Sequence, residues 1–315
     1  MRILVTGAGG QLGWALQRAL RGAAGAANPG PSGHGPLDVV ALDRAGLDLS
    51  DPAAIESAIG RLAPAVVINA AAYTAVDRAE REPELARRIN ADAPAAMARA
   101  CVRVGAALVH FSTDYVFDGR KPAPYVEDDA TAPLNVYGRT KLAGERAVFD
   151  STCAAIVLRT TWVYGEHGEN FAKTMLRLAC ERTQLRVVSD QHGAPTSAAR
   201  LAELVRELIG QAGATPADWF AAHGGLYHAS AAGRTTWFDY ARTVIATAAE
   251  SPAMRARLRL GAADVEPIAT ADYPTPAARP ANSLLDSSRL AQRLGHAMPD
   301  WRGDVVDCVR RLLAG

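Results

Sequence analysis

The sequence predicts an α/β protein with a doubly wound parallel sheet and a second, smaller α/β lobe. Short apolar runs alternate with longer helical stretches through the first half of the chain, and this rhythm changes beyond residue 165. Strand, helix and strand in repeated order predict right-handed crossovers and hence a parallel sheet. We expect a first domain at residues 1–165 and the lobe at residues 166–315, with some later segments returning to the main sheet.

The strands of the first domain are expected where hydrophobic runs do not alternate, the pattern of strands buried on both faces. These runs are RILVTG (2–7), VVALD (39–43), AVVINAA (65–71), ALVHFST (107–113) and IVLRTTWVYG (156–165). The helices expected between them are Gln11–Arg21, Pro52–Leu62, Glu84–Val104 and one that carries Tyr137. The stretch RGAAGAANPGPSGHGP (21–36) predicts a flexible surface loop, not a site.

The second half has a less regular pattern. It predicts helices at Phe171–Arg182, Ser197–Gln211 and Trp237–Ala249, short strands at 185–190 and 225–230, and a last amphipathic pair of helices that ends at Leu313. A chain of 315 residues exceeds the size at which a single core stops growing. A domain with an added lobe is therefore expected.

The composition excludes several classes of function. Hydrophobic residues make up 49% and charged residues 21%, as in an ordinary globular protein, and the formal net charge is +1. The four cysteines are scattered without metal-ligand spacing, which favours reduced thiols. Neither a signal peptide nor an apolar run of ~20 residues is evident. We expect a cytoplasmic protein with no nucleic-acid partner and no membrane partner.

A Gly-rich turn, GAGGQLG, follows the first strand and opens the first helix. In a Rossmann domain Gly7 allows the tight turn, Gly10 lets the backbone approach a pyrophosphate, and Gly13 permits close packing of helix on strand. The helix beginning at Gln11 and Leu12 points its free amides at the phosphates. This context predicts a dinucleotide-binding Rossmann sheet.

The ends of the following strands supply further candidate cofactor contacts. Asp43 favours NAD by accepting bonds from the adenosine ribose, whereas Arg44 favours a 2′-phosphate, so NADPH and NADH both stay open. A charged strand end that faces solvent is the alternative for both residues. The other candidates are Asp48, Leu49, Ala70, Ala71 and Ala72.

The segment LNVYGRTKLAGE (134–145) places Tyr137 and Lys141 four residues apart at the start of a helix. Spacing alone does not decide their role, because side chains at i and i+4 on any helix touch. The fourth strand, however, ends at Thr113, and ligands of open α/β sheets bind outside the carboxyl ends of the strands. The Gly-rich turn, Thr113 and the tyrosine helix therefore converge on one crevice.

Seven blocks carry a resemblance to a known family: GxxGxxG, NAAAYTAVD, STDYVFDG, NVYGRTKLAGE, RTTWVYG, NFAKTML and DQHGAPT. They resemble the extended short-chain dehydrogenase/reductase superfamily and, within it, the dTDP-4-dehydrorhamnose reductase family, over nearly the whole chain. The resemblance implies a Rossmann domain and a nucleotide-sugar-binding lobe. It also implies NADPH- or NADH-dependent reduction of the 4-keto group of dTDP-4-dehydro-6-deoxy-L-mannose to dTDP-L-rhamnose.

The resemblance assigns a catalytic triad to Thr113, Tyr137 and Lys141. Reduction of a ketone places charge on the carbonyl oxygen, and Tyr137 is expected to supply the proton. A free phenol has a pKa of about 10, which Lys141 is expected to lower while it also holds the nicotinamide ribose. Thr113 is expected to bond the developing alkoxide.

The resemblance also suggests contacts to the nucleotide sugar. These are Thr74, Val76, Asp77, Thr113, Asp114, Trp162, Asn170, Lys173, Gln191, Arg279 and Asn282. Lys173 and Arg279 suit a diphosphate. Core packing for Trp162, a surface charge for Arg279 and a turn for Asn282 are the alternatives. Sugar-nucleotide 4,6-dehydratases carry Glu after this Asp, where Tyr115 stands here, so dehydration is not expected.

The sequence departs from the family where some members bridge a dimer through magnesium and glutamates. Ala15, Ala199 and Arg302 stand at those positions, so we expect no metal, and a monomer or a metal-free homodimer. Two other functions stay open: another epimerase or ketoreductase of the superfamily, and a non-catalytic subunit like the regulatory subunit of methionine adenosyltransferase. The intact triad argues against the second.

Overall fold

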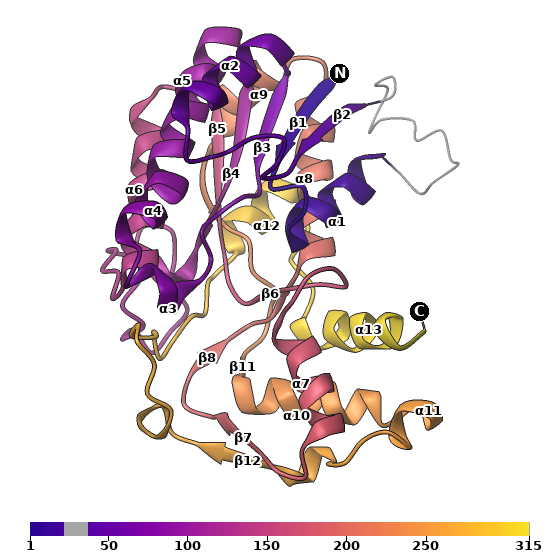
Figure 1. Cartoon of the computed structure of the whole chain (residues 1–315). Coiled ribbons are helices and arrows are strands. Elements are labelled where there is room, and N and C mark those ends of the chain that lie inside the picture. The colour runs from indigo at the N-terminus through magenta and orange to yellow at the C-terminus, as the bar shows by residue number, and fades with distance from the viewer. Residues whose placement is uncertain (22–36, 315) are drawn as a thin grey trace.

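A six-stranded parallel sheet forms the centre of the part that the computed structural model describes, residues 1–21 and 37–314 (Figure 1). Its strands are β1 (Arg2–Thr6), β2 (Asp38–Leu42), β3 (Val66–Asn69), β4 (Ala107–Thr113), β5 (Ala155–Thr160) and β10 (Gly225–His228), in the order β10-β5-β4-β3-β1-β2. Strand β2 lies on one side of β1, whereas β3, β4 and β5 lie in succession on the other side. The topological switch point, where such sheets bind ligands, therefore lies between β1 and β3.

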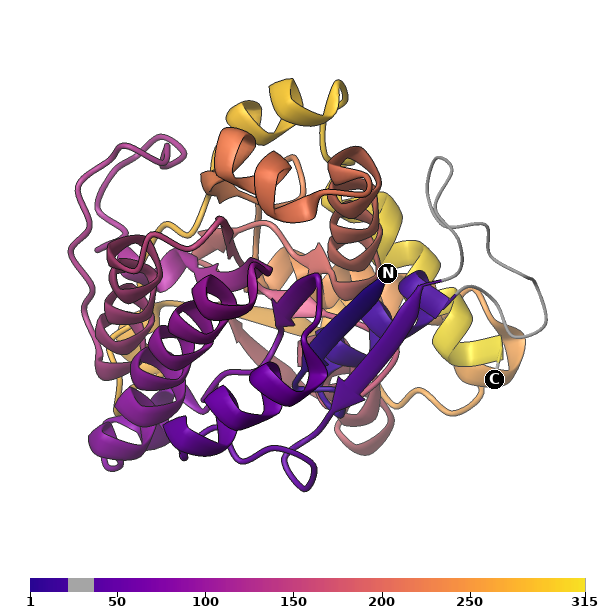
Figure 2. The ribbon, with the colours of Figure 1, turned by 90° about the horizontal axis from the view of Figure 1, so that it is seen from above.

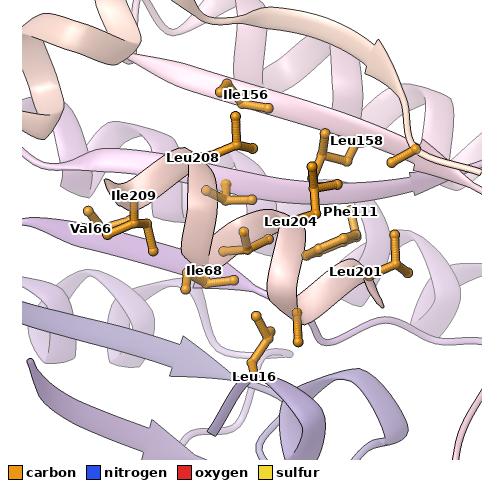
Figure 3. Close-up of a cluster of buried hydrophobic side chains, with 14 of the residues drawn as sticks. Leu16, Val66, Ile68, Phe111, Ile156, Leu158, Leu201, Leu204, Leu208 and Ile209 are labelled. Atoms are coloured by element: carbon orange, nitrogen blue, oxygen red, sulfur yellow. The ribbon is translucent and has the colours of Figure 1, made fainter. Parts of the chain in front are cut away.

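Helices cover both faces of this sheet (Figure 2). On one face lie α1 (Gln11–Arg21), α8 (Ala198–Ala212), α9 (Pro216–His223) and α12 (Ser288–Leu294), and on the other α2 (Pro52–Leu62), α5 (Ala93–Val104) and α6 (Val136–Asp150). Leu201, Leu204 and Leu208 of α8 pack on apolar side chains of the strands (Figure 3). Burial on both faces explains why the strands are continuously apolar.

The predicted elements agree with the observed ones within two residues at each end, with two exceptions. The first is the helix expected at 84–104, which is divided into α4 (Pro83–Arg87), a π-helical turn (Arg88–Asp92) and α5. Pro94 explains this break, because it lacks an amide hydrogen and its ring clashes with the carbonyl one turn earlier. The short α3 (Val76–Ala79) precedes this region.

The second exception is the strand expected at 156–165. It is divided into β5 and β6 (Val163–Tyr164), because the backbone turns at Trp162, which has a φ of 46°. The sequence also does not predict α9 or β12 (Val265–Ile268). The predicted loop at 21–36 lies, apart from Arg21 at the end of α1, outside the described residues.

The second lobe lies beyond the carboxyl edge of the sheet and has its own apolar core (Figure 1). It contains α7 (Phe171–Glu181), α10 (Trp237–Ala248), α11 (Pro252–Arg255) and α13 (Trp301–Ala314), with the strand pairs β7 (Leu185–Val188) with β12, β8 (His192–Gly193) with β11 (Thr235–Thr236), and β6 with β9 (Thr196–Ser197). Two segments of the second half return to the main domain: β10 pairs with β5, and α8 packs beside α1. None of the described helices is long and apolar enough to span a bilayer.

Candidate active site

The turn between β1 and α1 has the geometry of a phosphate cradle. Gly7 has a φ of 73°, and a Cβ there would lie 2.8 Å from the backbone of Ala71. A Cβ on Gly13 would lie 2.0 Å from the Gly7 carbonyl oxygen, so α1 packs on the turn as closely as glycine alone allows. This close packing leaves the first amides of α1 facing the open side of the turn, where they favour an anion.

A hollow of about 660 Å³ runs from this turn to the start of α6. A second hollow of about 280 Å³ adjoins it and shares Gly7, Asp43, Arg44, Ala71 and Ala72 with it. The predicted cofactor residues that line the larger hollow are Gly7, Gly10, Gln11, Leu12, Asp43, Arg44, Ala70, Ala71, Ala72, Tyr137 and Lys141. Asp48 and Leu49 line the smaller one, and Thr74 lines both. The two hollows form one elongated site at the topological switch point.

Asp43 and Arg44, two neighbouring charged residues, follow the end of β2 and make different contacts. The Asp43 carboxylate accepts hydrogen bonds through Oδ1 from the backbone amides of Ala45 and Gly46, both at 3.0 Å. Arg44 lines both hollows and forms no ion pair with any described residue. One carboxylate oxygen of Asp43 is therefore used by its own turn, while the Arg44 guanidinium stays available for an anion.

Tyr137 lies in the first turn of α6, which Asn135 caps by accepting a bond from the amide of Gly138 at 2.8 Å. Its ring packs edge-on against Tyr115, with centroids 5.5 Å apart. Burial raises the pKa of Tyr137 to about 12, although a hydrogen bond with Thr113 acts in the opposite direction. The expected lowering of this pKa by Lys141 is therefore wrong for this structure, because desolvation of the phenol dominates.

Lys141 is buried one turn further along α6, and its Nζ donates to the carbonyl oxygen of Phe111 at 2.5 Å. Burial lowers the pKa of Lys141 to about 8, against an opposing effect from Glu145. The His110 ring is buried nearby, and its Nδ1 accepts a bond from Asn69 at 3.0 Å. Burial and Lys141 hold the pKa of His110 well below its usual value, so this ring is neutral.

Thr113 and Asp114 are buried where β4 ends. The Thr113 hydroxyl donates to Asp114 Oδ1 at 3.1 Å and accepts from the amide of Tyr115 at 3.2 Å. Burial raises the pKa of Asp114 to about 6. A ketone oxygen near Tyr137 would therefore compete with Asp114 for the hydroxyl hydrogen of Thr113.

A segment of the second lobe closes over the Gly-rich turn. Asn170 caps α7 and donates through Nδ2 to Gln11 Oε1 at 3.0 Å, and His167 donates through Nε2 to the Gly9 carbonyl at 3.1 Å. Lys173 donates to the carbonyl of Gly168 at 2.9 Å. Two predicted sugar contacts, Asn170 and Lys173, thus lie beside the phosphate cradle, and their contact with a sugar nucleotide stays a prediction.

Three more predicted contacts hold the segment 275–284 against the first domain. Arg279 forms a bidentate ion pair with Asp77, with both N–O distances at 2.7 Å, and this pairing lowers the pKa of Asp77. Asn282 donates to the carbonyls of Lys121 at 2.7 Å and Ala123 at 3.0 Å. Asp77 and its neighbour Val76 belong to α3. The polar side chains of Asp77, Arg279 and Asn282 are therefore partnered with the protein itself.

Trp162 and Gln191 meet through Trp237 in the second lobe. The rings of Trp162 and Trp237 stack with centroids 3.6 Å apart, and Gln191 accepts a bond from Trp237 Nε1 at 3.2 Å. A Cβ on Gly193 would lie 2.5 Å from the Trp162 ring, so that glycine makes room for the stack. The left-handed backbone of Trp162 is a strained conformation that the packing holds in place.

Sequence reasoning missed several residues that line the larger hollow. They are Gly9, Ala45, Phe111, Ser112, Thr160 and Val163. Ser112 and Thr160 lie at the carboxyl ends of the neighbouring strands β4 and β5. That position could have predicted both as residues that line the site. The signal was lost for Thr160 because the sequence predicts a strand that continues past it to residue 165.

Ala15 and Ala199, on α1 and α8, line another hollow of about 400 Å³, and Arg302 lies near the start of α13. Within residues 1–21 and 37–314, no group of three or more His, Cys, Asp or Glu side chains is arranged to hold a metal ion. The oligomeric state stays a prediction.

Comparisons with known proteins agree over the full length of the chain. The family model described as the RmlD substrate binding domain matches residues 1–314. The dTDP-4-dehydrorhamnose reductase of Shigella flexneri is 45% identical, with 99% of this chain and 98% of that one covered. The crystal structure of such a reductase from Clostridium acetobutylicum has a TM-score of 0.85 at 34% identity, covering 99% and 100% of the two chains.

A second crystal structure bears on the cofactor. The dTDP-4-dehydrorhamnose reductase of Bacillus anthracis, solved in complex with NADP, has a TM-score of 0.82 at 34% identity and covers 99% of this chain and 98% of that one. Identity at this level over whole chains establishes kinship beyond a shared fold. The chain belongs to the dTDP-4-dehydrorhamnose reductase family.

Proposed function

We propose that this protein reduces the 4-keto group of dTDP-4-dehydro-6-deoxy-L-mannose, giving dTDP-L-rhamnose. The observation that carries the proposal is the continuity of the site: one hollow runs from the glycine cradle to Tyr137 and Lys141. The cradle fits a dinucleotide, because Gly7 and Gly13 lie where any Cβ would meet backbone. We assign cofactor binding to residues 1–165 and the nucleotide sugar to residues 166–315 together with the edge that faces them.

The roles of the triad follow from its surroundings. When bound, the reduced nicotinamide supplies the hydride. Tyr137 keeps its proton at neutral pH, because burial raises its pKa to about 12, so it is in the form that a proton donor needs. Thr113 hydrogen-bonds the ketone oxygen, and the Lys141 ammonium holds the ribose beside it. Lys141 has donors left for this, because only one N–H is directed at Phe111.

The test is an assay of NADPH and NADH oxidation with dTDP-4-dehydro-L-rhamnose, followed by NMR of the product. We expect stoichiometric cofactor oxidation and a new C4 hydrogen on the sugar. An epimerase would change a ring configuration without net oxidation of the cofactor. Binding of NADPH without any turnover would reject the proposed reduction.

We predict that Arg44 directs the enzyme toward NADPH. A charge-assisted hydrogen bond contributes about 1.5–3 kcal/mol, so Arg44→Ala should weaken NADPH binding about 10- to 100-fold and change NADH binding little. Isothermal titration with each cofactor measures the ratio. Arg61→Ala, an exposed arginine at the end of α2, is the control. An equal loss for both cofactors would assign Arg44 to the common part of the nucleotide.

We predict that NADPH binding weakens as the pH rises through about 8, the pKa of Lys141. The ordinary pKa of a lysine side chain is 10.5. Because burial lowers it, the Lys141 amine is mostly protonated and charged below pH 8 and mostly neutral above it. One proton is involved, so affinity falls by at most about tenfold per pH unit. Titrations between about pH 7 and 9.5 measure the slope. Lys141→Met should bind more weakly with no slope, and a flat wild-type profile would contradict the role of the charge.

A further inference from the structure

Asn170 joins the second lobe to the Gly-rich turn through a single side-chain amide. Its Oδ1 accepts a hydrogen bond from the backbone amide of Lys173 at 3.1 Å and so caps α7. Its Nδ2 donates to the carbonyl oxygen of Gly165 at 2.8 Å and to Oε1 of Gln11 at 3.0 Å. Both hydrogens of the amide are therefore used, one within its own segment and one across to α1.

Gln11 belongs to the cofactor side of this contact. It is the first residue of α1 and lines the larger hollow. Its side chain is also confined from the side of the lobe, because Gly168 has a φ of 72° and a Cβ there would lie 3.1 Å from Gln11 Cγ. The second lobe therefore holds a side chain that lines the dinucleotide site.

His167 makes a second contact from the same segment. Its ring stacks on Trp14 of α1 with centroids 5.4 Å apart and an interplanar angle of 8°, and its Nε2 donates to the Gly9 carbonyl. The segment is in turn fixed to its own lobe, because Glu166 forms an ion pair with Arg311 of α13 and α7 packs in the core of the lobe. A change in the position of the lobe would therefore reach the Gly-rich turn through this segment.

We propose that the hydrogen bond between Asn170 and Gln11 couples the dinucleotide site to the second lobe, so that NADPH and the nucleotide sugar each bind more tightly when the other is present. A dinucleotide beside Gln11 restricts that side chain, and through Asn170 it also restricts the lobe. The second ligand then binds to a lobe that is already ordered, so less conformational freedom is lost on binding. Asn170 is a positioning residue in this role, because it acts through Gln11. The inference rests on the proposed function, since it needs a nucleotide sugar in the second lobe.

The test measures the binding of NADPH and of dTDP, each alone and each with the other at saturation, by isothermal titration. The ratio of the two dissociation constants of one ligand is the coupling factor, and linkage makes it the same for both ligands. We expect a factor of about 5 to 150 in the wild type. A residue with a purely structural role changes the stability or the two affinities of each ligand alike, and such changes cancel in this ratio.

Asn170→Ser separates the contact with Gln11 from the cap of α7. A serine oxygen still caps a helix but is too short to reach Gln11, so the coupling factor should fall about three- to tenfold, as the loss of one neutral hydrogen bond does. Gln11→Ala removes the same bond, leaves α7 unchanged and should lower the factor equally. Ser251→Ala is the matched control. Ser251 caps α11 of the same lobe through the amide of Met254, and its loss should leave the factor unchanged.

The double variant, Asn170→Ser with Gln11→Ala, completes the comparison. Because the same bond is lost in each case, the double variant should lose no more coupling than either single variant. A wild-type factor near 1, or an unchanged factor in Asn170→Ser, would overturn the inference even where the enzyme reduces the sugar. Coupled binding of the two ligands without reduction of the sugar would instead reject the proposed reaction and leave the coupling in place.

Discussion

Tyr137→Phe is expected to lower kcat by about 10²- to 10⁴-fold, the range that general acid catalysis contributes. The variant removes one oxygen and leaves a ring that still packs against Tyr115. Because burial raises the pKa of the Tyr137 phenol to about 12, the phenol keeps its proton throughout the neutral pH range. The measurement is the rate of NADPH oxidation with saturating sugar nucleotide, beside NADPH binding without it.

Tyr115→Phe is the matched control for that experiment. Tyr115 is a neighbouring tyrosine whose pKa burial also raises, and it lies on the short helical turn that follows β4. Its loss should change kcat by well under tenfold. Equal losses of kcat in the two variants would indicate that either substitution disturbs the packing of the Tyr115 and Tyr137 rings. A fully active Tyr137→Phe enzyme that binds NADPH normally would remove Tyr137 from the role of proton donor.

Glu145→Gln is expected to reduce the stability of the fold by about 3–5 kcal/mol, the cost of leaving a buried charge without its partner. Glu145 and Arg159 are 3% and 4% exposed and form two hydrogen bonds of 2.9 and 2.7 Å. The pair lies one turn beyond Lys141 and links α6 to β5. Urea or thermal unfolding measures the loss.

Two further variants define the origin of that loss. Removing both charges together, with Glu145→Gln and Arg159→Met, should recover much of the stability, because no unpaired buried charge remains. Glu56→Gln weakens the contacts of a half-buried surface carboxylate with the exposed Arg99 and Arg103, and it should cost less than about 1 kcal/mol. If the double variant is as unstable as Glu145→Gln, the loss comes from packing rather than from an isolated charge.

The agreement between expected and observed elements has a local cause. The apolar runs of the central strands and the helical spacing between them are periodicities of neighbouring residues, and they require no knowledge of distant contacts. The roles of Gly7 and Gly13 can also be predicted from the sequence, because the turn needs a left-handed backbone at Gly7 and no Cβ at Gly13. The position of Thr113 at the end of its strand, shortly before the helix that carries Tyr137 and Lys141, led to the prediction that these three residues lie at one edge of the sheet.

Contacts between residues far apart in the sequence could not be predicted in this way. Asp77 and Arg279 are separated by 202 positions and form a bidentate pair, and Asn282 bonds two carbonyls of the first domain. Trp162 turns out of the expected strand because it stacks on Trp237. Each of these contacts depends on which segments the fold brings together. The local sequence pattern around each residue does not indicate which distant segment it will meet.

The sequence by itself determined the parallel sheet, the glycine cradle and the chemical types of the groups at its carboxyl edge, because these follow from local periodicity and backbone conformation. Only the tertiary structure decided the electrostatics of the site. Burial raises the pKa of Tyr137 to about 12 and lowers that of Lys141 to about 8, and it leaves the hydroxyls of Ser112 and Thr160 without partners. The physical reason is that the free energy of a charge or a polar group depends on everything that excludes water from it, and that surrounding shell comes from segments far apart in the chain.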